Sequence, residues 1–443
     1  LEALCSSIGE PSYRAKQILS WIYEKGATAF DEMSNLSKDF RKQLEEKYQV
    51  FQTKVDSIVQ ITEQPGCNQV TPPISPPLQG GEAGGGITTF VSVHPTPITP
   101  PTRGGGKTIP PPVPLTEGDK GGGGRSGGGA ELLPTFQSPS QGKREEEGKN
   151  LANKKRLLQD NKLDSTEKFL IHLSDENVIE CVLLREGRKI TACVSTQVGC
   201  AMACQFCASG LLGLERNLTV GEIVEQALHI KNHLRHDEHL TNIVFMGIGE
   251  PLKNYDNVVK AVRIMNAEWG LGIGARHITI STVGIIDGMR RLAQEGIQVN
   301  LAISLHAPND VIRSKIIPSN KKTGINNIIA AAREYFKTTR RDISFEYILI
   351  DGVNASKQDA ESLARLLKGV QCNVNLLPVN PVEEFHLKPP SQETIEMFCK
   401  TLEKHGLVVT LRKRKGDSIK AACGQLRLQR HKFLWKKEEL FVK

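Results

Sequence analysis

From residue 190 onward, segments typical of strands and segments typical of helices alternate in regular order. The strand-like runs are ITACVST, NIVFMGIGEP, HITISTVG, NLAISLHAP, ISFEYILIDGV and NVNLLPVNP, with amphipathic stretches between them. This alternation predicts a parallel sheet covered by helices, because parallel neighbours need a long crossover connection. Six strand–helix units are too few for a closed eightfold barrel, so we expect an α/β fold with an open, partial (β/α)6 barrel over residues 190–430.

Polar motifs follow several of these strands. GIGEP, STVG, SLHAP and PVNP each stand where a predicted strand ends. In parallel α/β folds the chemistry is carried by the loops at the C-terminal edge of the sheet. We therefore expect the active site at that edge.

The rest of the chain differs in composition from this core. Residues 1–63 contain two amphipathic segments and predict a small helical accessory domain. Pro and Gly make up 34 of the 84 residues from 65 to 148. A segment of this composition buries too little apolar surface to offset the entropy lost on ordering, so residues 64–150 are predicted to be a disordered insertion. Residues 165–189 predict short strands leading into the barrel, and residues 431–443 a basic tail.

The chain of 443 residues has a formal net charge of +8. Residues 65–148 hold 6 Lys/Arg and 7 Asp/Glu, so the rest of the chain carries a net charge of +9. This charge favours a polyanionic partner such as RNA; ordinary surface charge explains it equally well. No apolar run is long enough to span a bilayer, and no signal-peptide pattern is seen in the first residues of the sequence. Ten cysteines are too sparse for a disulfide scaffold. These features predict a cytoplasmic protein with reduced thiols. The chain begins at Leu1 rather than Met, so we expect residues before it.

Three cysteines in GCAMACQFCASG follow the first barrel strand: Cys200, Cys204 and Cys207. A structural zinc site needs four protein ligands, for which Cys181 and Cys193 are upstream candidates. A [4Fe–4S] cubane with three cysteine ligands leaves one iron open to a substrate or cofactor. Three buried thiols without a metal are the remaining alternative. The compact triplet at the mouth of the predicted barrel favours the iron–sulfur cluster.

The spacing C-x3-C-x2-C on the loop after the first strand of a partial barrel resembles the radical S-adenosylmethionine (SAM) superfamily. In that superfamily the open iron binds SAM, and one-electron reduction cleaves SAM to a 5′-deoxyadenosyl radical. More narrowly, ACVSTQVGCAMACQFCASG, VFMGIGEPL, STVGI, LAISLHAP, LLPVNP and GDSIKAACGQL resemble the RlmN/Cfr family, which methylates adenine in RNA. The resemblance covers residues 1–63 and about 165–430.

This resemblance implies a methyltransferase acting on carbon 2 of an adenosine in 23S rRNA, in the peptidyl transferase centre, and of the adenosine 3′ to the anticodon in tRNAs. It implies an S-methylcysteine intermediate and two SAM molecules per turnover. The sibling reaction at carbon 8 of the same rRNA adenosine stays open, because both reactions use the same motifs. A non-catalytic RNA-binding protein with a structural metal is the alternative from another class, and it predicts zinc without SAM turnover.

The family match also assigns residues to roles. The methyl-carrying thiol maps to Cys423, the proton acceptor to Glu180, and the resolving thiol, which forms a transient disulfide with Cys423, to Cys193. Judged without the family, Glu180 would be a solvated strand-edge carboxylate and Cys193 a buried strand thiol. SAM binding is assigned to residues at the strand ends: Gly249, Glu250, Ser281, Ser304, Leu305, His306 and Asn380.

The partners follow from the same resemblance. The four basic residues at 412–415 are candidates for RNA phosphate contacts, as is the basic tail, and Arg14 and Lys16 are weaker candidates. An electron donor such as flavodoxin or ferredoxin is expected. We expect a monomer with no membrane partner.

Overall fold

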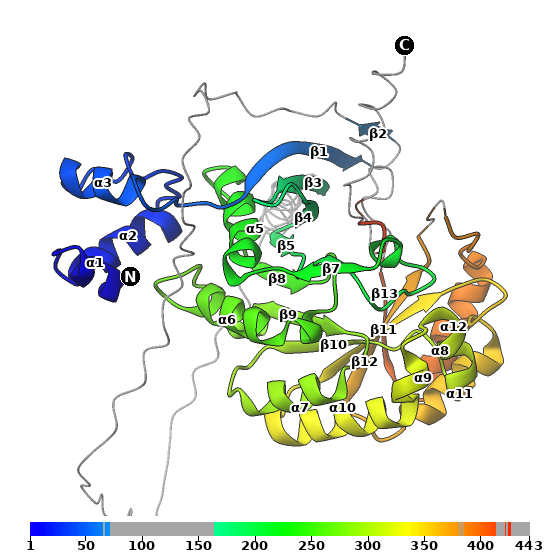
Figure 1. Ribbon diagram of the computed structural model, residues 1–443. Helices are drawn as coiled ribbons and strands as arrows, with labels where there is room; N and C mark the ends of the chain where they lie inside the picture. Colours follow the sequence, from blue (N-terminus) through cyan, green and yellow to red (C-terminus); the bar gives the residue numbers. More distant parts are fainter. Residues whose placement is uncertain are drawn as a thin grey trace, which may run out of the picture. The chain divides into compact units, whose positions relative to one another are not determined.

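The computed structural model of the chain contains a mixed sheet of eleven strands with a parallel and an antiparallel half (Figure 1). The structure describes residues 1–64, 67–70, 164–380, 382, 384–412, 421 and 424–426, and only the backbone of residues 61–64 and 67–70. None of the helices in these described parts is long and apolar enough to cross a membrane.

Seven strands form the parallel half and confirm the predicted alternation. Neighbouring strands pair in parallel throughout. The strand at residues 408–411 was not predicted, because it is only four residues long and a run of basic residues follows it directly. In order across the sheet the strands are β13 (Val408–Leu411), β12 (Cys372–Pro378), β11 (Ile343–Leu349), β10 (Asn300–Ser304), β9 (Ile278–Thr282), β8 (Asn242–Phe245) and β5 (Lys189–Cys193).

Helices occupy the crossovers between these strands, as predicted. They are α5 (Val220–His233), α6 (Tyr255–Asn266), α7 (Ile286–Gln294), α10 (Ile325–Thr339), α11 (Lys357–Leu366) and α12 (Gln392–Lys404). The sequence did not predict α12, or the two short helices that precede α10, which are α8 (Asp310–Ile316) and α9 (Asn320–Thr323). The connection from β5 to α5 adds a two-stranded hairpin of β6 (Gln197–Gly199) and β7 (Leu214–Asn217), and three short 3-10 turns cover Ala208–Gly210, Pro251–Lys253 and Ala275–His277.

Four antiparallel strands continue the sheet beyond β5 in the order β4 (Val178–Glu186), β3 (Ser165–His172), β1 (Lys54–Gln64) and β2 (Cys67–Val70). The structure differs here from two predicted boundaries. Residues 54–63, which were assigned to the helical domain, form most of β1, and residues 67–70 of the predicted insertion form β2. The reason is that strand β1 finds a pairing partner in β3, about a hundred residues later in the chain, which local patterns do not reveal. The rest of the predicted insertion lies outside the described residues.

The N-terminal segment forms three helices, α1 (Glu2–Ser7), α2 (Tyr13–Tyr23) and α3 (Lys38–Glu45). The latter two correspond to the predicted amphipathic segments. Ser37 begins α3 as an N-cap, because its side chain accepts a hydrogen bond from the amide of Phe40. The buried apolar side chains of this segment include Cys5, Ala15, Ile18, Phe30, Met33, Leu36, Phe40 and Leu44.

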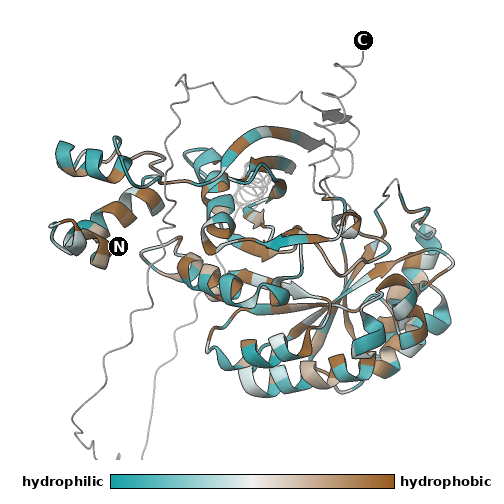
Figure 2. Ribbon diagram, viewed as in Figure 1, coloured by the Kyte–Doolittle hydropathy of each residue, from teal (hydrophilic) through white to brown (hydrophobic). Residues whose placement is uncertain are grey.

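The two faces of the parallel sheet differ in polarity. One face carries side chains that are fully buried, such as Ile280, Ile303, Phe345 and Val374. The helices are hydrophilic on their outer surfaces and turn hydrophobic residues towards the sheet (Figure 2). The opposite face, which we call the inner face, carries half-buried polar side chains: Ser281, Ser304, Glu346 and Asn375. Alternation along each strand therefore separates an apolar core from a polar face that can hold a ligand.

Arg185 of β4 is the centre of a buried ion-pair network in the antiparallel half. Its guanidinium binds Glu238 through two hydrogen bonds of 3.0 and 3.1 Å and also binds Glu167 of β3. Glu167 in turn lies 2.6 Å from Nε2 of His233 on α5. Burial alone would raise the pKa of the Glu167 carboxyl, but the contacts with His233 and Arg185 bring it below its usual value. This network joins the antiparallel strands to α5.

Replacing Arg185 with Met should lower the free energy of unfolding by about 3–5 kcal/mol, because two buried carboxylates would lose their guanidinium partner. The pKa values of Glu167 and Glu238 are lowered in the folded protein, so both groups are charged at neutral pH and the stabilisation is lost as the pH falls through those folded pKa values. Urea unfolding of both proteins at neutral pH measures the difference. Arg290→Met is the matched control, because its pair with Glu334 is exposed at 54% and 52%; equal losses in the two variants would contradict the prediction.

Candidate active site

The three cysteines of the C-x3-C-x2-C motif lie on the loop between β6 and β7. Cys200 and Cys204 are 9% and 8% exposed, and Cys207 is half-buried. Burial raises the pKa of all three thiols, that of Cys200 to about 12. The pKa of Cys204 is raised further by both Cys207 and Cys200. The three thiols therefore form one group of neighbours.

A positively charged metal centre suits these three cysteines, because it stabilises their thiolates, whose negative charges otherwise repel one another. Within the described ranges, no three His, Cys, Asp or Glu side chains converge closely enough to hold a single metal ion. A [4Fe–4S] cubane is held by cysteine thiolates, one on each iron, so three cysteines leave one iron open. Cys181 and Cys193, the sequence candidates for a fourth zinc ligand, lie on β4 and β5 as neighbours of each other. The donor set thus fits a cubane with one open iron better than four-coordinate zinc.

The GIGEP motif follows β8 and runs beside the residues that lead into β6. The amide of Gly247 donates to the carbonyl of Val194, and the amide of Glu250 donates to the side chain of Gln197. Gly249 has a φ of +107°, and a Cβ there would lie 2.6 Å from the Cβ of Gln197, so only glycine fits. The buried Glu250 carboxylate accepts the amides of Leu252, at 3.1 Å, and Val283, at 2.8 Å. The motif is therefore fixed to the end of β9.

The other predicted SAM residues gather along the C-terminal edge of the parallel strands. Ser281 lies in β9, Ser304 ends β10 and is followed by Leu305 and His306, and Asn380 is buried just after β12. This arrangement fulfils the expectation that polar residues at strand ends meet at one edge.

His306 joins this edge to the cysteine loop. Its ring meets the ring of Phe206, which lies between Cys204 and Cys207, edge to face at 4.9 Å. The Nδ1 atom accepts a 3.1 Å hydrogen bond from the amide of Ile348, so the proton of the neutral ring lies on Nε2. Burial, followed by the charge of Arg313, lowers the pKa of His306 to about 3. The ring is therefore an uncharged hydrogen-bond donor at neutral pH.

Strand register places the predicted acid–base and thiol residues on the inner face. Cys193 of β5 pairs with Val182 of β4, and Glu180 lies two residues before Val182, so both side chains share a face. Cys193 also pairs with Val244 of β8, which pairs with Thr279 of β9, two residues before Ser281. Glu180, Cys193 and the predicted SAM residue Ser281 therefore face the same side of one sheet.

Glu180 is fully buried and not the solvated strand-edge carboxylate that the residue alone suggested. It forms a 3.1 Å ion pair with Lys168 of β3, which is also buried. Lys168 pairs in register with Val182 and so belongs to the same inner face. Sequence reasoning missed this residue; the only available signal was a charged residue inside the apolar strand segment EKFLIHL.

Cys423 lies outside the described residues, but the residues just after it are described. The carbonyl of Gly424 accepts a 2.7 Å hydrogen bond from the amide of Ala208, and the carbonyl of Leu426 accepts one of 2.8 Å from the Ser209 hydroxyl. Gly424 has a φ of +82°, and a Cβ there would lie 3.0 Å from the carbonyl oxygen of Phe206. The chain next to Cys423 thus contacts the cysteine loop directly beside Cys207.

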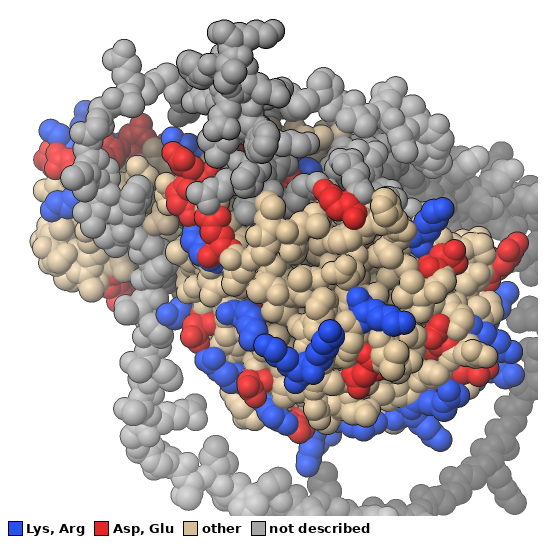
Figure 3. Space-filling model, turned by 45° about the vertical axis from the view of Figure 1, so that its right-hand side comes forward, with Lys and Arg blue, Asp and Glu red and all other residues tan. Residues whose placement is uncertain are grey.

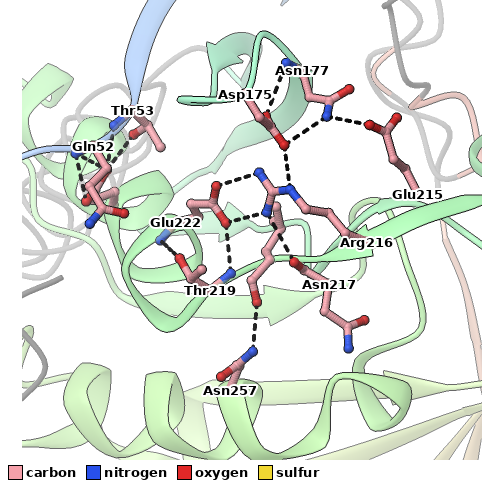
Figure 4. Close-up of polar contacts among 12 residues, drawn as sticks. Gln52, Thr53, Asp175, Asn177, Glu215, Arg216, Asn217, Thr219, Glu222 and Asn257 are labelled. Atoms are coloured by element: carbon pink, nitrogen blue, oxygen red, sulfur yellow. Dashed lines mark hydrogen bonds and ion pairs between the residues drawn. The ribbon is translucent and has the colours of Figure 1, made fainter. Parts of the chain in front are cut away.

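The hairpin that carries the cysteine loop is fixed by Arg216 of β7 (Figure 4). Its guanidinium lies 2.6 Å from Asp175, in the turn between β3 and β4, and makes two 2.8 Å hydrogen bonds to Glu222 of α5. Glu222 also closes a capping box with Thr219 at the start of α5. One arginine therefore ties the base of the loop to the antiparallel half and to the first crossover helix.

The predicted RNA contacts are only partly described. Arg14 is engaged within its own domain by Glu10, Gln17 and the carbonyl of Asn35, whereas Lys16 is exposed. Arg412 lies 3.5 Å from Glu346 of the inner face, while residues 413–415 and the basic tail lie outside the described part. Basic and acidic side chains are interspersed over the face seen in Figure 3, with basic ones gathered along its lower edge.

Comparisons with known proteins agree with this geometry. Residues 1–50 match the family described as the ribosomal RNA large subunit methyltransferase N-terminal domain, and residues 194–367 match the radical SAM superfamily. A probable dual-specificity RNA methyltransferase RlmN from Symbiobacterium thermophilum is 48% identical over 425 residues, covering 96% of this chain and 88% of the relative. Its counterpart from Clostridium perfringens is 50% identical over 264 residues, 60% of this chain and 76% of the relative.

A solved structure agrees as well. A radical SAM methyltransferase from Sphaerobacter thermophilus superposes with a TM-score of 0.71 at 34% identity, and the match covers 96% of each chain. The resemblance inferred from the motifs is thereby confirmed. The chain belongs to the RlmN family of radical SAM RNA methyltransferases.

Proposed function

We propose that this enzyme methylates carbon 2 of an adenosine in the peptidyl transferase centre of 23S rRNA and of the adenosine 3′ to the anticodon in tRNAs. The observation that carries the proposal is the shared inner face of Glu180 and Cys193, next to a cysteine loop that contacts Gly424. Methyl transfer through a cysteine needs a proton acceptor and two thiols around one substrate position. The relatives' names, dual-specificity RNA methyltransferase, support an RNA methyltransferase with two specificities, and the family model matched by residues 1–50 names ribosomal RNA of the large subunit.

Cys200, Cys204 and Cys207 would hold one [4Fe–4S] cluster with SAM at its open iron. When bound, this cluster supplies the electron that cleaves SAM. The strand-end residues complement the polar groups of SAM: carbonyls and the carboxylate of Gly249 and Glu250 suit the ammonium group. The hydroxyls of Ser281 and Ser304, the backbone of Leu305, the Nε2–H of His306 and the amide of Asn380 suit the ribose and adenine.

Cys423 would carry the methyl group, because carbon 2 of adenine is electrophilic and cannot attack the sulfonium of SAM directly. A thiolate is a far stronger nucleophile towards that methyl group than a serine hydroxyl. The methyl group on sulfur would lose one hydrogen atom to a radical derived from a second SAM, and its carbon would then bond to the base. Glu180 would remove the proton from carbon 2, and the unpaired electron left on the adduct would return to the one-electron carrier. The buried ammonium of Lys168 supplies the counter-charge of Glu180 and holds one carboxylate oxygen in place.

Cys193 would then release the product. Its thiolate attacks the sulfur of Cys423, the S–S bond forms as the carbon–sulfur bond breaks, the electron pair stays on carbon, and a proton completes the methyl group. The two thiols are thereby oxidised to a disulfide, which a cellular dithiol must reduce before the next turnover. A small one-electron carrier such as flavodoxin or ferredoxin would supply the cluster's electron. We place the enzyme in the cytoplasm as a monomer.

Replacing Cys200, Cys204 or Cys207 with Ala should abolish the brown absorbance, the bound iron and sulfide, and RNA methylation together. Two remaining cysteines do not retain a cubane with an open iron. Anaerobic reconstitution followed by absorbance and iron–sulfide analysis is the measurement. Cys399→Ala, a half-buried thiol of α12, should keep all three properties. A triplet variant that keeps its cluster and its activity would refute the site.

Nucleoside mass spectrometry of 23S rRNA and tRNA treated with the enzyme should locate the new methyl group at carbon 2 of adenine. A methyl group at carbon 8 would instead assign the sibling reaction. Binding of zinc without SAM turnover would support a non-catalytic RNA-binding protein.

The roles of the two thiols differ in time, and this gives a further prediction. Cys193→Ala should accumulate RNA covalently attached through Cys423, because the thioether link forms but cannot be broken. Glu180→Ala should stall in the same way, and Lys168→Met should accumulate a smaller amount of the adduct. Cys423→Ala should bind SAM and its cluster yet form no adduct, because no thiol accepts the methyl group.

The readout is an RNA–protein band that survives denaturing electrophoresis. Cys372→Ala is the matched control, because this half-buried cysteine lies at the opposite, N-terminal end of parallel strand β12 and should turn over normally. Normal turnover of Cys193→Ala, or identical behaviour of the Cys193 and Cys423 variants, would show that the assigned roles are wrong.

A further inference from the structure

Arg313 of α8 is a buried charged residue to which the proposed reaction assigns no role. It is 1% exposed. Four of its five N–H groups donate to neutral acceptors within the protein, and none of these is a carboxylate. The acceptors are the carbonyls of Leu305 at 2.9 Å, Ser304 at 2.9 Å and Val283 at 2.6 Å, and the side-chain oxygen of Asn320 at 2.6 Å.

The nearest carboxylate reaches Arg313 only through an intermediate amide. The side-chain oxygen of Asn320 accepts a hydrogen bond from the guanidinium, and the side-chain N–H of Asn320 donates a 2.7 Å hydrogen bond to Asp310. A buried charge is costly unless an opposite charge or strong hydrogen bonds compensate it. This arrangement contrasts with Arg185, which contacts two carboxylates directly. The charge of Arg313 is solvated by dipoles and is left available to a further anion.

The cysteine loop is the neighbour that can provide this anion. The amide of Gln205 donates a 2.9 Å hydrogen bond to the carbonyl of Ile316, the last residue of α8. Cys204 and Ile316 also pack in one apolar cluster. Helix α8, which carries Arg313, therefore packs against a proposed cluster ligand.

The carbonyls that Arg313 binds stand at the ends of two neighbouring strands. Val283 follows β9, Ser304 ends β10 and Leu305 comes directly after it. Ser304 and Leu305 belong to the proposed SAM site. One planar guanidinium with a fixed fork of donors thus sets the relative position of two strand ends.

We propose that Arg313 is a positioning residue that serves as the fixed counter-charge of the cluster and also holds the SAM-binding ends of β9 and β10 together. The proposal rests on the proposed cluster site at Cys200, Cys204 and Cys207. A [4Fe–4S]2+ core with three thiolates is an anion, and it gains a second negative charge when it takes one electron from a donor. A nearby positive charge stabilises the reduced form more than the oxidised form and raises the midpoint potential.

Two changes to the charge test this role in the reconstituted holoenzyme. Arg313→Gln removes the charge. The double variant Asp310→Asn/Asn320→Asp keeps Arg313 and moves the carboxylate by one hydrogen bond into contact with the guanidinium, at constant net charge. Each variant should shift the midpoint potential of the cluster to more negative values. A tenfold change in the equilibrium constant for one-electron reduction of the cluster corresponds to a shift of about 59 mV. Potentiometric titration with dithionite, followed by EPR of the reduced cluster, measures the shift without reference to methylation.

Arg313→Lys separates the charge from the fork. It should keep a potential close to that of the unchanged enzyme but weaken SAM binding severalfold, because an ammonium cannot hold carbonyls of both strands in one plane. Equilibrium binding of SAM under anaerobic conditions measures this loss. Arg341→Gln is the matched control: Arg341 binds Asn300 at the opposite end of β10, so its loss should change neither quantity.

A wild-type potential in both Arg313→Gln and the double variant, with the cluster intact, overturns the counter-charge role. Unchanged SAM affinity in Arg313→Lys overturns the clamping role. If Arg313→Gln does not fold, the double variant decides the first point, because it keeps every hydrogen bond of Arg313. Failure of the proposed function is a separate outcome: Cys204→Ala would then retain the cluster.

Discussion

Strand β5 connects the two halves of this enzyme and fixes how they face each other. It pairs antiparallel with β4 and parallel with β8, so one continuous hydrogen-bonded sheet carries both halves. Because side chains alternate along each strand, the register of these two pairings sets which side every residue faces. A slip of one residue would turn Cys193 towards the helix-covered core. The position of Glu180 and Cys193 on the same face as Ser281 depends on this pairing.

The buried charges of the protein fall into two kinds. Arg185 is compensated by direct contact with two carboxylates, and Lys168 is paired with Glu180. Arg313 is held by carbonyl and amide oxygens, and the side chain of Asn320 lies between its guanidinium and the carboxylate of Asp310. Paired charges join elements of the fold, whereas a charge solvated only by dipoles keeps its field for a ligand. The proposed role of Arg313 rests on this difference.

The cysteine loop is held from several directions at once. Arg216 fixes the hairpin at its base, the carbonyl of Ile316 in α8 binds Gln205 in its middle, and the ring of Phe206 packs on His306. The carbonyls of Gly424 and Leu426 bind Ala208 and Ser209 of this loop. A cluster bound there would sit among groups that are already in place, which lowers the cost of ordering the site.

The sequence by itself determined the strand–helix alternation, the open parallel sheet, the cysteine triplet and the polar strand ends, because each is encoded by local spacing. Its motifs also identified the family and named Glu180 and Cys193. Only the tertiary structure decided that residues 54–64 join the sheet, that Lys168 faces Glu180 and that helix α8, which carries Arg313, packs against Cys204. These facts depend on pairings between residues far apart in the chain, and no local pattern records the register of such a pairing.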